Sequence, residues 1–133
     1  MKDWQQRIHL VLGDDSERSE ENALRYLAYL RTALKFPVRV TGREDFQWEE
    51  RYVLGGWSQS EYARLKKTNP SFTDIFDLIE LLPPGSDADV TAKISRISDK
   101  RTFMIGLYWL TTTTEDDKNF QTLDDYATWH ANY

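Results

Sequence analysis

The side chains of this sequence that could do chemistry are mainly carboxylates. Acidic residues stand as neighbouring pairs at several places, among them Asp14-Asp15, Glu44-Asp45, Glu49-Glu50, Asp116-Asp117 and Asp124-Asp125. Ca²⁺ prefers oxygen ligands, carboxylates among them, and takes roughly six to eight of them. Acidic runs are also typical of ordinary solvated surfaces. The pairs therefore permit a calcium site built from separate loops, but their spacing does not distinguish it from surface charge.

The order of the acids excludes an EF-hand. The stretch "DADVTA" from Asp87 begins with the D-x-D spacing of that calcium loop. However, Ala92 stands where the loop requires glycine, and Ser98 stands where it requires glutamate. Any calcium site in this chain would therefore draw its oxygens from parts that lie apart in the sequence.

Other kinds of site chemistry find little support. The chain has no cysteine, and its two histidines, His9 and His130, form no H-E-x-x-H pair. No G-x-S-x-G nucleophile motif and no phosphate-binding glycine loop is present. We therefore predict that the protein is not an enzyme, and that both histidines are surface or half-buried residues. A small hydrolase with carboxylate-bound metal is a weaker alternative.

Length and charge narrow the class of protein. The chain has 133 residues, 14% aromatic residues and a net charge of −5, which predicts one folded domain over residues 1–133. The acidic balance argues against nucleic acid as a partner and favours cations or basic partners. We find no signal-peptide segment at the start, and the apolar run 102–114 is too short to cross a bilayer. A cytoplasmic protein without a membrane partner is expected.

Hydrophobic periodicity predicts the elements that must position the carboxylates. A helix capped by Ser16 or Ser19 ends before Pro37, and a short strand closed by Gly42 follows. The segment "RIHLVLG" fits a short strand or a helix. Further elements are a long excursion with a helix at 58–67, strands at 74–82, 89–98 and 102–114, and a last helix at 122–132 capped by Thr122.

Short turns between the strands predict an antiparallel sheet. The run 102–114 is apolar on both faces, so we expect it in the centre of the sheet or covered. The predicted fold class is α+β, with a small antiparallel, SH3-like half-barrel sheet, an N-terminal helix and a short C-terminal helix.

The order of these landmarks resembles the small acidic calcium-binding proteins of the cyanobacterial CcbP family. The resemblance rests on an R-I opening, a Y-L…L-x-F-P segment that runs into the first strand, and a closing D-Y…W helix. In this chain those features fall on Arg7, Ile8, Tyr29, Leu30, Leu34, Phe36, Pro37, Asp125, Tyr126 and Trp129. The resemblance covers most of the chain. It implies a non-EF-hand calcium binder that acts as a buffer or sequestering protein.

The resemblance also suggests ligands. Glu44 and Asp45, just after the first strand, are the best match to a family site. The acidic C-terminal part adds four candidates, Asp116, Asp117, Asp124 and Asp125. In a half-barrel the loop after the first strand could lie beside the C-terminal segment, so that one site could draw on both. Asp124 and Asp125 could instead stabilise the dipole of the last helix from its first turn. Glu49 and Glu50 are expected to be neutralised at the surface by neighbouring arginines.

An interaction module is the alternative function. Aromatic residues of the excursion, such as Trp48, Trp57 and Tyr62, could form a surface for a peptide or a basic protein, with acids around it. A protein with this alternative function would need no physiological metal.

Overall fold

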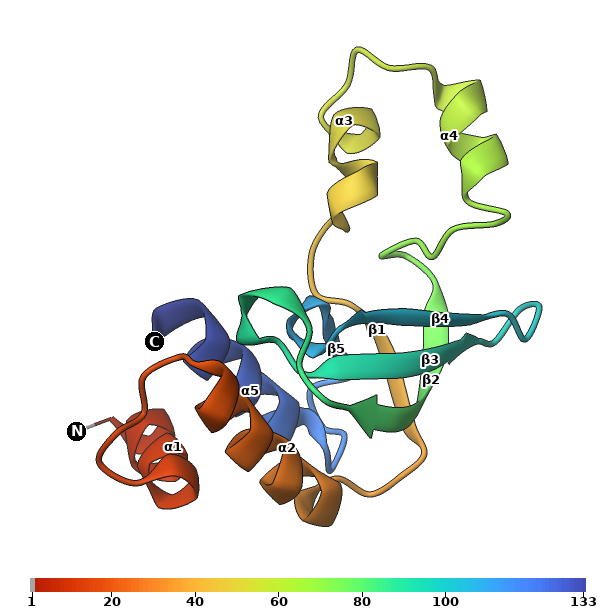
Figure 1. Ribbon diagram of the computed structural model, residues 1–133. Helices are drawn as coiled ribbons and strands as arrows, with labels where there is room; N and C mark the ends of the chain where they lie inside the picture. The colour runs from red at the N-terminus through yellow and green to blue at the C-terminus, as the bar shows by residue number, and fades with distance from the viewer. Residues whose placement is uncertain (1) are drawn as a thin grey trace.

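The structure, a computed structural model, describes residues 2–133 and has an antiparallel sheet at its centre (Figure 1). The strand order is β4-β3-β2-β1-β5. The strands are β1 (Val38–Gly42), β2 (Ile75–Leu82), β3 (Thr91–Arg96), β4 (Thr102–Gly106) and β5 (Leu110–Thr112). The α-helices in the described part are α1 (Asp3–Leu12), α2 (Glu20–Ala33), α3 (Glu50–Val53), α4 (Gln59–Leu65) and α5 (Phe120–Asn132). The predicted α+β class, with helices near both ends of the chain, is confirmed.

The three longer helices, α1, α2 and α5, gather beside one part of the sheet (Figure 1). Ser19 caps α2 because its hydroxyl accepts a hydrogen bond from the backbone N–H of Asn22 at 3.1 Å. The ring of Tyr26 lies 5.1 Å from that of Tyr126 and 5.2 Å from that of Trp129, centre to centre. All three aromatic residues are buried, so they join α2 to α5 in the core. The segment "RIHLVLG" is helical, as part of α1.

The sheet is open, with β4 and β5 as its two edges. Within residues 2–133 no ladder joins these edges, so the SH3-like half-barrel shape remains a prediction. In the same part of the chain no helix combines the length and apolar character needed to cross a membrane.

The predicted single strand at 102–114 is wrong. A 3₁₀ turn at Leu107–Trp109 divides it into β4 and β5, which pair with β3 and β1 at opposite sides of the sheet. The run is apolar because Leu107 and Leu110 are buried at this change of direction, and not because the strand is central. An apolar run alone does not separate these two causes.

The last helix begins earlier than predicted. α5 starts at Phe120 after Asn119, so Thr122 lies inside the helix and does not cap it. The first turn of α5 therefore holds no acid, and Asp124 and Asp125 lie in the second turn. The proposed dipole role of these two acids loses its basis, since that effect is strongest in the first turn.

Residues 47–72, which we call the arm, carry α3 and α4 away from the sheet (Figure 1). A buried carboxylate holds the base of the arm. Glu49 accepts hydrogen bonds from the Tyr62 hydroxyl at 2.6 Å, the Ser71 hydroxyl at 2.6 Å and the Phe72 N–H at 2.7 Å. The expectation that Glu49 is neutralised at the surface is wrong, because the fold buries it and satisfies it with neutral donors.

A buried guanidinium holds the other end of the arm. Arg96 of β3 donates to the backbone carbonyls of Lys66 at 2.9 Å and Lys67 at 2.8 Å, just after α4. It also pairs with Asp74 at 3.1 Å and Asp99 at 2.7 Å. Glu49 thus joins the two ends of the arm to each other, and Arg96 fastens the chain after α4 to the sheet, so that the positions of the acids on the arm are fixed.

Candidate functional site

Three carboxylates surround one hollow just after β1. Glu44 and Asp45 follow the strand, Glu50 begins α3, and Leu54 and Trp109 complete the walls of a space of about 280 Å³. Glu44 accepts a hydrogen bond from the Tyr108 hydroxyl at 3.2 Å. Within residues 2–133 none of the three acids forms an ion pair. This hollow therefore holds negative charge that no lysine or arginine offsets at close range.

The expected neutralisation of Glu50 does not occur, because the two nearby arginines are occupied elsewhere. The Arg51 guanidinium lies over the ring of Trp57, 4.8 Å from its centre. Arg43 donates to the backbone carbonyls of Tyr108 and Leu110, each at 3.1 Å. Both arginines support the fold around the hollow without closing it.

Asp124 lies near the hollow but faces an arginine. Its Oδ1 is 3.4 Å from Nη1 of Arg43, the residue before Glu44. Because this contact offsets the charge of Asp124, a cation bound by Glu44 and Asp45 would gain less from Asp124 than from Glu50.

Asp125 is engaged in the packing of two helices. Its carboxylate accepts hydrogen bonds from Arg7 of α1, from Nε at 2.6 Å and from Nη2 at 3.1 Å, and from the Gln121 amide at 2.9 Å. The hydrogen bond to Asp125 is the main reason that the pKa of Arg7 is raised. Asp125 is buried, so these contacts account for its position without a metal ion.

Asp116 and Asp117 lie at the far end of β1 from Glu44 and Asp45. β5 runs antiparallel to β1, with Leu110 opposite Gly42 and Thr112 opposite Val40. The chain after Thr112 therefore moves toward the beginning of β1. Asp117 accepts a hydrogen bond from the N–H of Asn119 at 2.7 Å, which orders this turn before α5.

The strand register thus places Asp116 and Asp117 away from the loop after β1, although the sequence analysis expected these residues to share one site with that loop. No group of three or more acidic or histidine side chains in residues 2–133 is already arranged to hold a metal ion. Glu44 and Asp45 instead share their hollow with Glu50, which was expected from the sequence to be neutralised at the surface by arginines. The sequence signal for Glu50 was only its place in an acidic pair.

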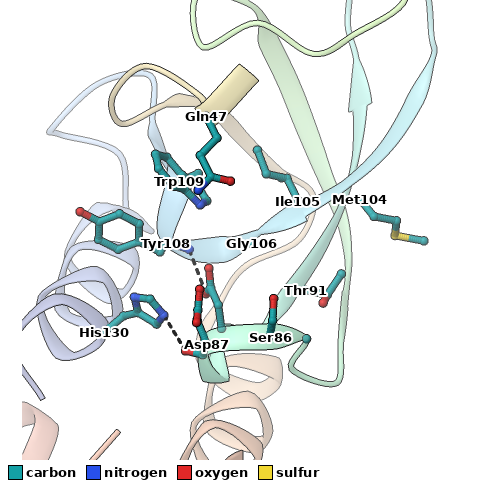
Figure 2. A pocket seen from close by; sticks show the side chains of 12 residues that line it. Gln47, Ser86, Asp87, Thr91, Met104, Ile105, Gly106, Tyr108, Trp109 and His130 are labelled. Atoms are coloured by element: carbon teal, nitrogen blue, oxygen red, sulfur yellow. Dashed lines mark hydrogen bonds between the residues drawn. The ribbon is translucent and has the colours of Figure 1, made fainter. Parts of the chain in front are cut away.

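A second acidic pocket, of about 420 Å³, lies between the loop after β2 and the end of β4 (Figure 2). Its walls include Asp87 and the buried Asp89, whose Oδ1 accepts hydrogen bonds from the Tyr126 hydroxyl at 2.7 Å and the Tyr108 N–H at 3.2 Å. Burial raises the pKa of Asp89 above its ordinary value, although the hydrogen bond from Tyr126 opposes that change. His130 contacts the backbone carbonyl of Asp87 at 3.1 Å.

Sequence reasoning missed this pocket. The D-x-D spacing of Asp87 and Asp89 was noticed, but only as a failed EF-hand. The backbone around it is unusual, because Asp87 and Ala88 both have positive φ, 60° and 53°. Such conformations cost energy in residues other than glycine and are enriched at functional sites.

Comparison with known proteins supports the fold. No protein-family model matches the chain, and no curated protein is similar to it. The crystal structure of Anabaena CcbP matches with a TM-score of 0.62 and 18% identity, covering 98% of this chain and 93% of that chain. A calcium binding protein in the calcium-binding form matches with a TM-score of 0.61 and 18% identity, covering 96% and 89%. The resemblance predicted from the sequence is confirmed as a shared fold: over nearly its whole length, this chain folds like Anabaena CcbP.

Proposed function

We propose that this protein binds Ca²⁺ in the hollow formed by Glu44, Asp45 and Glu50, and that it acts as a calcium buffer or sequestering protein without enzymatic activity. The observation that carries the proposal is three carboxylates around one space with no cationic partner. The shared fold with Anabaena CcbP and with a calcium-binding protein supports it. The hard oxygen donors of the hollow suit Ca²⁺ chemically.

The geometry of the hollow sets the expected strength of binding. Its carboxylates are not drawn together in advance, so the side chains must rotate to meet the ion and water must fill the remaining positions. We therefore expect a dissociation constant in the micromolar range or weaker, which lies with sensors and extracellular modules on the known scale. We also expect the hollow to prefer Ca²⁺ over Mg²⁺, because Mg²⁺ demands rigid octahedral geometry and gives up its waters reluctantly.

Calorimetric titration of the demetallated protein tests this function. Ca²⁺ should release or absorb heat with a saturating isotherm, and Mg²⁺ at the same concentration should give little. Bound Ca²⁺ should also raise the melting temperature by mass action, since the unfolded chain cannot hold converging ligands. Absence of heat, of NMR shifts and of thermal stabilisation at millimolar Ca²⁺ would refute the proposal.

The alternative interaction surface of aromatic residues on the arm is less well supported. Trp48 is half-buried and donates to the carbonyl of Pro70 at 2.6 Å, and Tyr62 is buried with its hydroxyl on Glu49. These two residues stabilise the arm internally. Only Trp57 of the three is exposed.

A further inference from the structure

A groove runs along the outer side of β4. It consists of two adjoining hollows that share Gln47, the end of β4 from Met104 to Gly106, and Trp109. One is the pocket of about 420 Å³ that contains Asp87 and Asp89. The other, of about 360 Å³, has apolar walls from Phe46, Trp48 and Pro70. Figure 2 shows Met104 and Ile105 on one side of the acidic pocket, with Tyr108 and His130 on the opposite side.

The backbone of β4 offers hydrogen-bonding groups to this groove. β4 is an edge strand, and its antiparallel register with β3 pairs Met104 with Lys93 and Gly106 with Thr91. On either side of this ladder, Arg96 N–H bonds to Arg101 O at 2.8 Å and Leu107 N–H bonds to Val90 O at 2.8 Å.

In an antiparallel ladder hydrogen-bonded and non-hydrogen-bonded pairs alternate. Counting from the two bonded pairs, Met104 and Gly106 occupy non-hydrogen-bonded positions, so their N–H groups point away from β3. Within residues 2–133 these two N–H groups have no backbone partner outside the strand ladder. They are therefore available to a further strand.

The acidic end of the groove carries a carboxylate oxygen without a partner. Asp89 is 7% exposed, and its two hydrogen bonds both go to Oδ1. No fully buried side-chain polar atom in residues 2–133 lacks a partner, so Oδ2 keeps contact with the open space of the pocket. Asp87 adds a second negative charge nearby, and neither acid pairs with a lysine or arginine in the described chain.

Gly106 makes this arrangement possible. A side chain at this position would collide with the Asp89 carboxylate, so only glycine lets the β4 backbone pass so close to it. The free N–H groups of the edge strand and the free carboxylate oxygen thus lie in the same groove.

We propose that the groove binds an extended peptide segment that adds to β4 as a further strand and places a lysine or arginine side chain against Asp89. Strand addition uses the free N–H groups for affinity and a side-chain pocket for specificity. A cationic side chain would pair with a desolvated carboxylate, and the net charge of −5 favours a basic partner at long range. A metal ion fits this pocket less well, because it offers two carboxylates, and Oδ1 of Asp89 already accepts two hydrogen bonds, whereas the hollow at Glu44 offers three carboxylates. The proposal stands independently of calcium binding near Glu44.

The experiment uses three pools of blocked hexapeptides and amide NMR of the whole protein. One central position is lysine, norleucine or glutamate, and the other positions are mixtures of valine, isoleucine, threonine and phenylalanine. The lysine pool should shift the amide resonances of Met104 and Gly106, and it should bind about tenfold or more tightly than the norleucine pool. The glutamate pool should not bind.

Two variants test the two parts of the groove. Asp89→Asn should remove the preference for lysine over norleucine, and Asp87→Asn should reduce it if Asp89→Asn does not fold. Met104→Pro should abolish binding of every pool, because it removes an N–H that points outward while leaving the bonds to β3 intact. Met104→Ala, which keeps that N–H, and Asp116→Asn, which makes the same charge change elsewhere, are the controls.

Three results would overturn the proposal. They are no binding of any pool at about 1 mM peptide, equal binding of the lysine and norleucine pools, and a Met104→Pro variant that binds as the wild type does. If Ca²⁺ alone shifts the Tyr108 and Val90 amides while no peptide does, the pocket is a metal site instead.

Discussion

Replacing Glu49 with glutamine should loosen the arm that holds Glu50 at the hollow. The Glu49 carboxylate accepts three hydrogen bonds from donors that are all neutral, and it is completely buried. A glutamine amide keeps one acceptor oxygen but turns the other position into a donor. At least one of the three donors then faces an N–H₂ group and loses its partner.

The size of the effect follows from these bonds. A hydrogen bond to a charged group contributes about 1.5–3 kcal/mol, and a buried donor left without a partner costs a similar amount. We therefore expect Glu49→Gln to lower the free energy of unfolding by about 2–4 kcal/mol. The same change should lower the pKa of Tyr62, which burial, together with the bond to Glu49, raises to about 12.

Urea denaturation measures the stability, and hydrogen exchange at the Phe72 amide reports local opening of the arm. Glu50→Gln is the matched control, since Glu50 is the exposed neighbour and its replacement should change stability by less than about 0.5 kcal/mol. Glu50→Gln should weaken Ca²⁺ binding because it removes a ligand charge, whereas Glu49→Gln should weaken it less, because it loosens the position of Glu50 and keeps its charge. If the free energy of unfolding of the Glu49 variant falls by less than about 1 kcal/mol, the hydrogen bonds of Glu49 do not hold the base of the arm, and this explanation is refuted.

The remaining predictions concern the other acids. Asp125→Asn should cost about 1–2 kcal/mol in urea denaturation, because it removes a partly exposed ion pair with the guanidinium of α1, and it should not change Ca²⁺ affinity. The double variant Asp116→Asn/Asp117→Asn should keep Ca²⁺ affinity within about twofold in calorimetry, because these acids lie at the far end of β1; a larger loss would bring them back as ligands. The hydrogen bond from Arg96 lowers the pKa of Asp99 to about 2. Because this pKa is lower in the folded protein than in the unfolded chain, the stabilisation is complete above about pH 4 and is lost as the pH falls toward 2. An NMR titration of the Asp99 carboxyl carbon measures it, and a midpoint near 4 would contradict the ion pair.

The sequence predicted the helices and strands that are marked by a cap or by a regular spacing of apolar residues within the element itself. The cap at Ser19, the helical spacing of leucines after it and the alternation from Val90 to Ile94 each identify an element without knowledge of its neighbours. The division of 102–114 was not predictable in this way. Leu107 and Leu110 are buried at the turn between β4 and β5. In the sequence, an apolar run that is buried at a turn cannot be told from one that forms a central strand.

The site was predictable only in part for the same reason. Glu44 and Asp45 were identified because they follow a clear strand. Glu50 joins them through the arm, whose position depends on Glu49 meeting Ser71 and Phe72 more than 20 residues later. Contacts of that range leave no trace in the local spacing of residues.

The most direct test of the account is calorimetric Ca²⁺ titration of two double variants with equal charge changes. Glu44→Gln/Asp45→Asn alters the proposed site, and Asp14→Asn/Asp15→Asn alters an exposed acidic pair that follows α1. We predict that the first variant loses at least about tenfold in affinity for Ca²⁺, which corresponds to about 1.4 kcal/mol. The second should bind within about twofold of the wild type, since it changes only the distant charge. Equal affinities of both variants and the wild type would contradict a calcium site in this hollow.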